Sequence, residues 1–155
     1  MSVGPVLRLE RTFDAPREEV FAAWTSPEVL RRWWAAGPGW ECTGAEVDLR
    51  VGGRYRLGMR ESPEQPPYVV GGEYLEVDPP ERLVYTWTWE GDPESQQGSR
   101  ESVVTVRFLA AGSGTTVELV HEGFATPEVR DRHAHGWMGV LDSLAARGLG
   151  APASG

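Results

Sequence analysis

The sequence predicts an α+β fold in which a curved antiparallel sheet of about seven strands surrounds a long C-terminal helix, with two short helices after the first strand. Three observations predict it. Apolar and polar residues alternate between residues 43 and 122, as they do in strands with one buried face. Short turns containing glycine and proline separate these runs, which favours antiparallel pairing of neighbouring strands. Residues 127–147 instead carry apolar side chains at helical spacing.

The N-terminal part begins with one strand and one short helix. Residues 6–13 (VLRLERTF) alternate, with Leu7, Leu9 and Phe13 on one side. In the APREEVFAAW segment that follows, Pro16 takes the first helical position and acidic residues fill the first turn, which is typical of a helix N-terminus. We expect this helix to close one end of the sheet.

The second short helix leads into three closely spaced tryptophans, in the segment WWAAGPGW. Ser26 is the expected N-cap, and Gly37-Pro38-Gly39 is the expected end of the helix. Trp33 and Trp34 share the apolar face, so Trp33 should pack toward the sheet and Trp34 should reach the rim of a cavity. Trp40 follows the break and is expected to be the most mobile of the three.

The central part is interpreted as a series of hairpins. Val47 and Leu49 face inward ahead of a tight turn at Gly52-Gly53, and the next strand returns through Tyr55 and Met59. The further strands are expected at residues 68–78, 82–89, 102–109 and 115–122.

The C-terminal helix is predicted to start after Thr126 and to run to about Arg147, with Gly148 as its stop. Its buried stripe consists of Val129, His133, Trp137, Val140, Leu141 and Leu144. Gly136 lies inside this helix, where glycine costs about 1 kcal/mol relative to alanine. Two explanations remain open: a close approach of the helix to the sheet or to a short helix, or a ligand beneath the glycine.

Composition and charge narrow the function classes. One globular domain is expected over residues 6–148, with a polar flexible loop at 91–100 and a disordered tail at 149–155. The formal net charge of −8 opposes binding to nucleic acid or to an anionic membrane surface. Neither a membrane span nor a signal peptide is recognised, and the lone Cys42, expected to be half-buried, suits a reducing cytoplasm. No cofactor motif is found.

Aromatic residues gather on the predicted inner face of the fold. Broad rings with polar edges suit a cavity that stays wet at one end, and plain core packing is the alternative. The chain has no isoleucine, which favours the cavity. The predicted ligand-binding residues are Trp33, Trp34, Trp40, Tyr55, Met59, Tyr85, Trp87, Trp89, Phe108, His121, His133 and Trp137.

Polar residues on the inner face define neither a catalytic residue nor a metal site. His133 and His135 point roughly 200° apart on the helix, so they do not face one metal ion. His121 and His133 are either packed core residues or polar groups of the pocket, and either could form an acid pair with Glu73. Arg11 is expected to face inward, toward a protein carboxylate such as Glu73 or the acid group of a ligand.

Several segments, taken in order, resemble one known family. They are APREEVFAAWTSPEVLRRWW, DLRVGGRY, GEYLEVDPPERLVYTW, SVVTVRF with GTTVELVHEGF, and HAHGWMGVLDSLA. Together they cover most of the chain and are similar to the SRPBCC superfamily of helix-grip folds, which includes START domains and birch-pollen allergens. Within it, the resemblance is to the branch of the activator of the heat-shock protein 90 ATPase.

The resemblance implies a helix-grip fold with a hydrophobic cavity between the sheet and the long helix. It also implies binding of a small hydrophobic or aromatic molecule, by a monomer or a homodimer. Two alternatives stay open, because the superfamily has several functions. One is a co-chaperone-like interaction domain that docks a chaperone partner through an aromatic patch at residues 33–40. The other is a polyketide cyclase or hydrolase that uses the same cavity.

Overall fold

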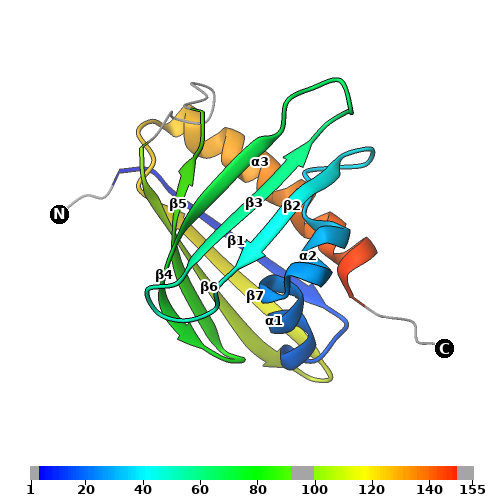
Figure 1. Ribbon diagram of the computed structural model, residues 1–155. Helices are drawn as coiled ribbons and strands as arrows, with labels where there is room; N and C mark the ends of the chain where they lie inside the picture. Colours follow the sequence, from blue (N-terminus) through cyan, green and yellow to red (C-terminus); the bar gives the residue numbers. More distant parts are fainter. Residues whose placement is uncertain (1–3, 92–99, 150–155) are drawn as a thin grey trace.

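The computed structural model describes residues 4–91 and 100–149, and it confirms the predicted helix-grip fold (Figure 1). Seven strands form one antiparallel sheet in the order β1-β7-β6-β5-β4-β3-β2. The strands are β1 (Val6–Phe13), β2 (Glu41–Val47), β3 (Arg54–Arg60), β4 (Tyr68–Asp78), β5 (Arg82–Trp89), β6 (Ser102–Ala111) and β7 (Gly114–Glu122). The predicted loop at 91–100 and the predicted tail at 149–155 lie almost wholly outside the described residues.

The helices occupy the places that the sequence predicts. They are α1 (Arg17–Thr25), α2 (Pro27–Trp33) and α3 (Pro127–Ser143), and a π-helical turn, η2 (Leu144–Gly148), continues α3. Figure 1 shows α3 crossing the concave side of the curled sheet, with α2 beside η2. Thr126 caps α3 as predicted, because its hydroxyl oxygen accepts a hydrogen bond from the backbone N–H of Val129 at 3.2 Å.

Ser26 is the N-cap of α2 as predicted, but its side chain makes no capping hydrogen bond, and its backbone carbonyl accepts from the N–H of Leu30. The predicted end of this helix is wrong. The helix α2 ends at Trp33, ahead of the Gly37-Pro38-Gly39 segment, since Trp34 already has an extended backbone with φ −70° and ψ 94°. The early ending turns the chain so that Trp34 leaves the helix toward the sheet.

The β2–β3 connection is longer than the tight turn predicted at Gly52-Gly53. β2 ends at Val47, and Leu49 lies outside the sheet with 38% of its surface exposed. Gly52 N–H donates to the carbonyl of Tyr74 and Tyr74 N–H donates to that of Gly53, both at 2.9 Å. The glycines therefore pair with β4, and Gly52, at φ +86°, adopts a conformation that favours glycine.

The close approach expected at Gly136 occurs instead one helical turn later, at Gly139. A Cβ atom on Gly139 would overlap the carbonyl oxygen of Ala36, in the segment after α2. A Cβ atom on Gly136 would meet no atom within 4 Å. The first explanation for Gly136 is thus wrong, and open space lies beside this residue.

Arg11 faces α3 as expected, but its partner is Asp142 and not Glu73. Asp142 lies in the last turn of α3, where the guanidinium can reach it across the sheet edge. Glu73 lies on the outer face of β4, because Tyr74 next to it is buried and the side chains alternate. The guanidinium carbon of Arg11 also lies 5.7 Å from the ring centre of Phe13.

Replacing Arg11 by alanine is expected to lower the free energy of unfolding by less than about 1 kcal/mol, since exposed ion pairs contribute little. The side chains of Arg11 and Asp142 are 37% and 70% exposed. Urea unfolding followed by circular dichroism measures the change. A loss above about 2 kcal/mol would show that the pair contributes far more than an exposed ion pair does.

Candidate ligand-binding site

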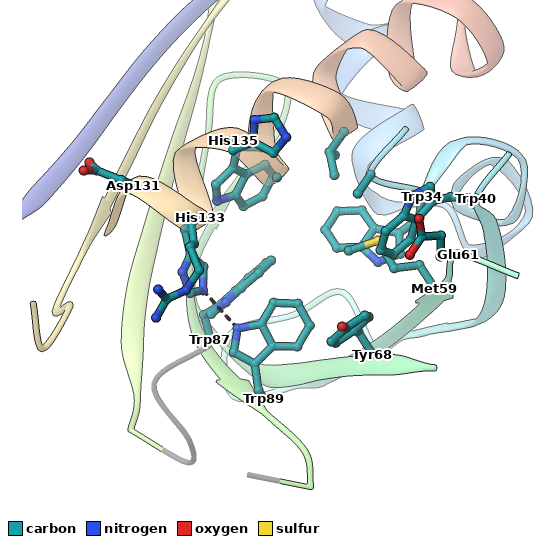
Figure 2. A pocket seen from close by; sticks show the side chains of 15 residues that line it. Trp34, Trp40, Met59, Glu61, Tyr68, Trp87, Trp89, Asp131, His133 and His135 are labelled. Atoms are coloured by element: carbon teal, nitrogen blue, oxygen red, sulfur yellow. Dashed lines mark hydrogen bonds between the residues drawn. The ribbon is translucent and has the colours of Figure 1, made fainter. Parts of the chain in front are cut away.

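A cavity of about 480 Å³ lies between α3 and the sheet, within the size range of small-molecule sites. Figure 2 shows the side chains that surround it. Its walls come from α3, from β3, β4 and β5, and from the segments that follow α2 and β3. The lining residues are Trp34, Ala36, Trp40, Met59, Glu61, Tyr68, Trp87, Trp89, Asp131, Arg132, His133, His135, Gly136, Trp137 and Val140.

The inner wall of the cavity consists of tryptophan rings in mutual contact. Ring centres of Trp34 and Trp137 are 6.0 Å apart, and those of Trp34 and Trp87 are 6.1 Å apart. Trp137 lies 5.1 Å from Trp87, and Trp89 meets Trp87 edge-on at 5.4 Å. These rings are buried, so the wall offers a planar molecule both ring faces and ring edges.

The outer part of the cavity is more polar and more exposed. Trp40 is half-buried and stacks on Tyr68, with ring centres 6.0 Å apart and ring planes at 25°. Tyr68 itself is 39% exposed. Glu61 and His135 are exposed and complete this side of the lining. The cavity therefore combines an apolar inner end with a wet outer end.

His121 lies behind the inner wall and has a fixed protonation state. The indole N–H of Trp137 donates to its Nδ1 at 3.1 Å. Because an indole nitrogen only donates, Nδ1 of His121 carries no proton and Nε2 does. Nε2–H then donates to the hydroxyl of Ser102 at 2.8 Å. This histidine is neutral, and it holds the Trp137 ring in place.

His133 has the same role for the neighbouring indole. Its Nε2 accepts from the indole N–H of Trp89 at 3.0 Å, the contact drawn as a dashed line in Figure 2. Its Nδ1–H donates to the carbonyl of Val129 at 2.9 Å. Both ring nitrogens are thus occupied, and His133 lies in the cavity wall as a neutral acceptor for an indole.

Neither histidine is placed as a general base for a hydroxyl nucleophile. Ser102 accepts its hydrogen bond from His121, which is the reverse of the direction that activates a serine. Glu73 lies on the outer face of the sheet, so the predicted acid pair with His121 or His133 does not form. The histidines position aromatic rings in this site.

Burial in the apolar wall lowers the pKa of His121 far below its ordinary value, and it lowers the pKa of His133 as well. The proximity of His133 adds to the lowering for His121. Protonating either Nδ1 of His121 or Nε2 of His133 would remove the acceptor of an indole N–H. The neutral wall is therefore stable only while both histidines are deprotonated.

We expect acid to destabilise the fold through these two histidines. In the unfolded chain they titrate near 6.5. Below that pH the unfolded state binds more protons than the folded state. The contribution of the two histidines to the free energy of unfolding is therefore fully present above pH 6.5 and decreases as the pH falls. The loss reaches up to about 1.4 kcal/mol per pH unit for each histidine. Urea unfolding between about pH 7.5 and pH 5 measures it.

The matched variant for this measurement is His121→Asn, which keeps an oxygen acceptor for Trp137 but does not titrate. It is expected to be less stable than the wild type at neutral pH, because the side chain is smaller. Its stability should also fall less steeply below pH 6.5. Equal slopes for the two proteins would contradict the assignment of a titrating, neutral His121.

Sequence comparison assigns the chain to a family. Residues 14–147 match the family described as Activator of Hsp90 ATPase homolog 1-like protein. The chain belongs to this family. A search of curated proteins found no match.

Three solved structures similar to this chain have the same fold, and two of them are described as AHSA1 or AHSA1-like proteins. The protein from Silicibacter pomeroyi is 30% identical over 92% of this chain and 96% of its own, with a TM-score of 0.76. The one from Aeromonas hydrophila is 27% identical over 92% and 90%, with a TM-score of 0.74. A Chromobacterium violaceum protein is 30% identical over 92% and 96%, with a TM-score of 0.76.

The structure separates the predicted ligand-binding residues into two groups. Those that line the cavity are Trp34, Trp40, Met59, Trp87, Trp89, His133 and Trp137. Those that do not line it are Trp33, Tyr55, Tyr85, Phe108 and His121, which are buried around it. Tyr55 and Tyr85 lie against each other, with ring centres 5.2 Å apart, and the Tyr85 hydroxyl accepts from the indole of Trp24.

The predicted ligand-binding set does not include the remaining cavity residues, although a ligand beneath Gly136 is one of the two explanations given for that glycine. These residues are Ala36, Glu61, Tyr68, Asp131, Arg132, His135, Gly136 and Val140. Helical spacing could have found two of them, since Gly136 and Val140 follow His133 at i+3 and i+7. Glu61 follows β3 and Tyr68 begins β4, close to the strand limits that alternation predicts, but alternation does not indicate that both ends of this connection reach the cavity.

The predicted aromatic docking patch at residues 33–40 does not exist as a surface. Trp33 is fully buried and Trp34 is 2% exposed, so only Trp40 offers part of its ring.

Cys42 is half-buried as expected, and burial raises the pKa of its thiol. Over residues 4–91 and 100–149, no helix has the length and apolar character to cross a membrane, and no three His, Cys, Asp or Glu side chains gather as metal ligands would.

Proposed function

We propose that this protein binds a small, mostly apolar aromatic molecule in the cavity between α3 and the sheet. The observation that carries the proposal is the cavity of about 480 Å³ with an inner wall of contacting tryptophans. Aromatic molecules pack well on such rings, by offset stacking or edge-on contact. The half-buried Trp40 and the exposed Tyr68 stand at the wetter end, where such a molecule would enter.

The arrangement of the polar groups supports binding rather than chemistry on the ligand. Both ring nitrogens of His121 and of His133 are engaged with protein groups. A general acid or base in this wall would first have to give up an indole N–H. The rigid, neutral wall therefore suits a carrier or sensor that holds its ligand unchanged.

Titration with the neutral fluorescent probe N-phenylnaphthylamine tests this proposal. We expect saturable binding of one equivalent by the wild type, with an increase in probe emission. Gly136→Leu should abolish it, because Gly136 lines the cavity and a side chain there enters open space. Met138→Leu is the matched control on the outer side of the same helix, where Met138 is 54% exposed, and it should bind like the wild type.

Two results would overturn the proposal. One is the absence of probe binding to a folded wild type. The other is equal affinity in the wild type and in Gly136→Leu, which would locate the probe outside the cavity. Thermal unfolding of both leucine variants shows whether they are folded, and the leucine at position 136 should not reduce helix stability.

A further inference from the structure

The indole N–H groups of the buried tryptophans differ in whether the protein supplies an acceptor. Four of these groups donate to protein atoms. The pairs are Trp24 with the Tyr85 hydroxyl, Trp33 with the Ala23 carbonyl, Trp89 with His133 Nε2, and Trp137 with His121 Nδ1, at 3.0 to 3.2 Å. Buried indoles usually find such a partner, because a buried donor without one costs free energy.

Trp34 and Trp87 are the exceptions among the described residues. The indole nitrogen of each is buried and has no hydrogen-bond acceptor in the protein. The two side chains are 2% and 3% exposed, they both line the cavity, and their ring centres are 6.1 Å apart. Two tryptophans in ring contact at the apolar inner end thus each carry an unpaired donor, although the chain provides acceptors for the neighbouring indoles.

We propose that the ligand carries a neutral carbonyl-type oxygen at its inner end, which accepts hydrogen bonds from the indoles of Trp34 and Trp87. This inference rests on the proposed function and narrows its ligand to aromatic ketones and similar carbonyl compounds. One carbonyl oxygen has two lone pairs, so it can accept from both N–H groups. Because both indole nitrogens are buried, the two edge-on rings must move apart to admit that oxygen.

The surroundings select a neutral acceptor over a charged one. The other aromatic rings in contact with these two are those of Trp33, Trp89, Trp137, His121 and His133. Both histidines are neutral, so no cation at this end would offset the loss of hydration of a carboxylate. The charged lining residues, Glu61, Asp131 and Arg132, are all exposed.

Equilibrium dialysis with fluorene and fluorenone tests the inference. The two tricyclic molecules have nearly the same shape, and only fluorenone has a carbonyl oxygen. The ratio of their Kd values is measured for the wild type, for Trp34→Phe, for Trp87→Phe and for the double variant. Because lost ring packing weakens both compounds alike, it cancels in this ratio. We expect the preference for fluorenone to fall roughly tenfold in the double variant. Trp40→Phe, which makes the same ring change at the half-buried outer end, should keep it.

A measurement on the wild type guards against variants that fail to fold. In protein labelled with ¹⁵N-tryptophan, fluorenone should move two indole N–H resonances downfield, and fluorene should not. Two results would overturn this inference and leave the proposed function standing. One is a ratio of Kd values for fluorene and fluorenone that Trp34→Phe and Trp87→Phe leave unchanged. The other is an equal shift of the same indole resonances by both compounds. If neither compound nor N-phenylnaphthylamine binds, both proposals are wrong.

Discussion

Gly139→Ala is expected to lower the free energy of unfolding by about 1–3 kcal/mol, the usual cost of overpacking. The added methyl group would overlap the backbone carbonyl oxygen of Ala36, and a backbone atom cannot rotate away as a side-chain end can. Either α3 or the segment after α2 must therefore shift. Because Ala36 lines the cavity, the same change should weaken binding of N-phenylnaphthylamine. Urea unfolding and probe titration measure the two effects.

The matched control is Gly136→Ala, one turn earlier on the same helix. A Cβ atom there meets no atom within 4 Å, so the change removes only the helix penalty of glycine. It should raise the free energy of unfolding by up to about 1 kcal/mol. Changes of opposite sign in the free energy of unfolding of the two alanine variants would locate the helix contact at Gly139. Destabilisation of similar size in both would mean that the contact is not what distinguishes these glycines.

These two glycines also show where prediction from the sequence stops. Helical spacing identified α3 and its buried stripe, because a period of 3.6 residues needs no tertiary information. Which of two glycines touches another segment depends on how far the helix is rotated and shifted over the sheet. That geometry is set by packing against the sheet and the segment after α2, and the sequence pattern of α3 does not contain it.

The partner of Arg11 could not be predicted for a related reason. Alternation along β1 placed Arg11 on the face toward α3, and the structure agrees. Its partner Asp142 is 131 residues away in the chain, and only the docking of α3 on the sheet edge brings the two together. Glu73 is not the partner, because the register of β4 places it on the outer face of the sheet next to the buried Tyr74.

Strand alternation predicted the facing of the cavity residues better than their location. Tyr85 and Trp87 are both buried on the inner face of β5, as predicted. Two residues along a strand span about 6.6 Å, however, which is enough to separate a core position from a cavity wall. Tyr85 therefore packs with Tyr55 and Trp24 in the core, while Trp87 lines the cavity.

Trp33→Ala is expected to lower the free energy of unfolding by about 3–5 kcal/mol, the range for truncating a large buried aromatic side chain. The Trp33 side chain is fully buried, and its indole N–H donates to the carbonyl of Ala23 at 3.0 Å. Its ring also contacts Trp24 at 5.6 Å and Trp34 at 6.0 Å. The substitution leaves a large void where α1, α2 and η2 meet, so a partly unfolded protein is the expected result.

Trp40→Ala is the comparison that separates core from cavity among these tryptophans. Trp40 is half-buried, and its main aromatic contact is the stack on Tyr68, so a loss of about 0.5–1.5 kcal/mol is expected. Trp40→Ala should weaken N-phenylnaphthylamine binding more than Trp33→Ala does, because Trp40 lines the cavity and Trp33 does not. Urea unfolding followed by far-ultraviolet circular dichroism avoids the change in fluorescence that either substitution causes. Equal destabilisation by the two changes would contradict the division of this tryptophan cluster into a core residue and a cavity residue.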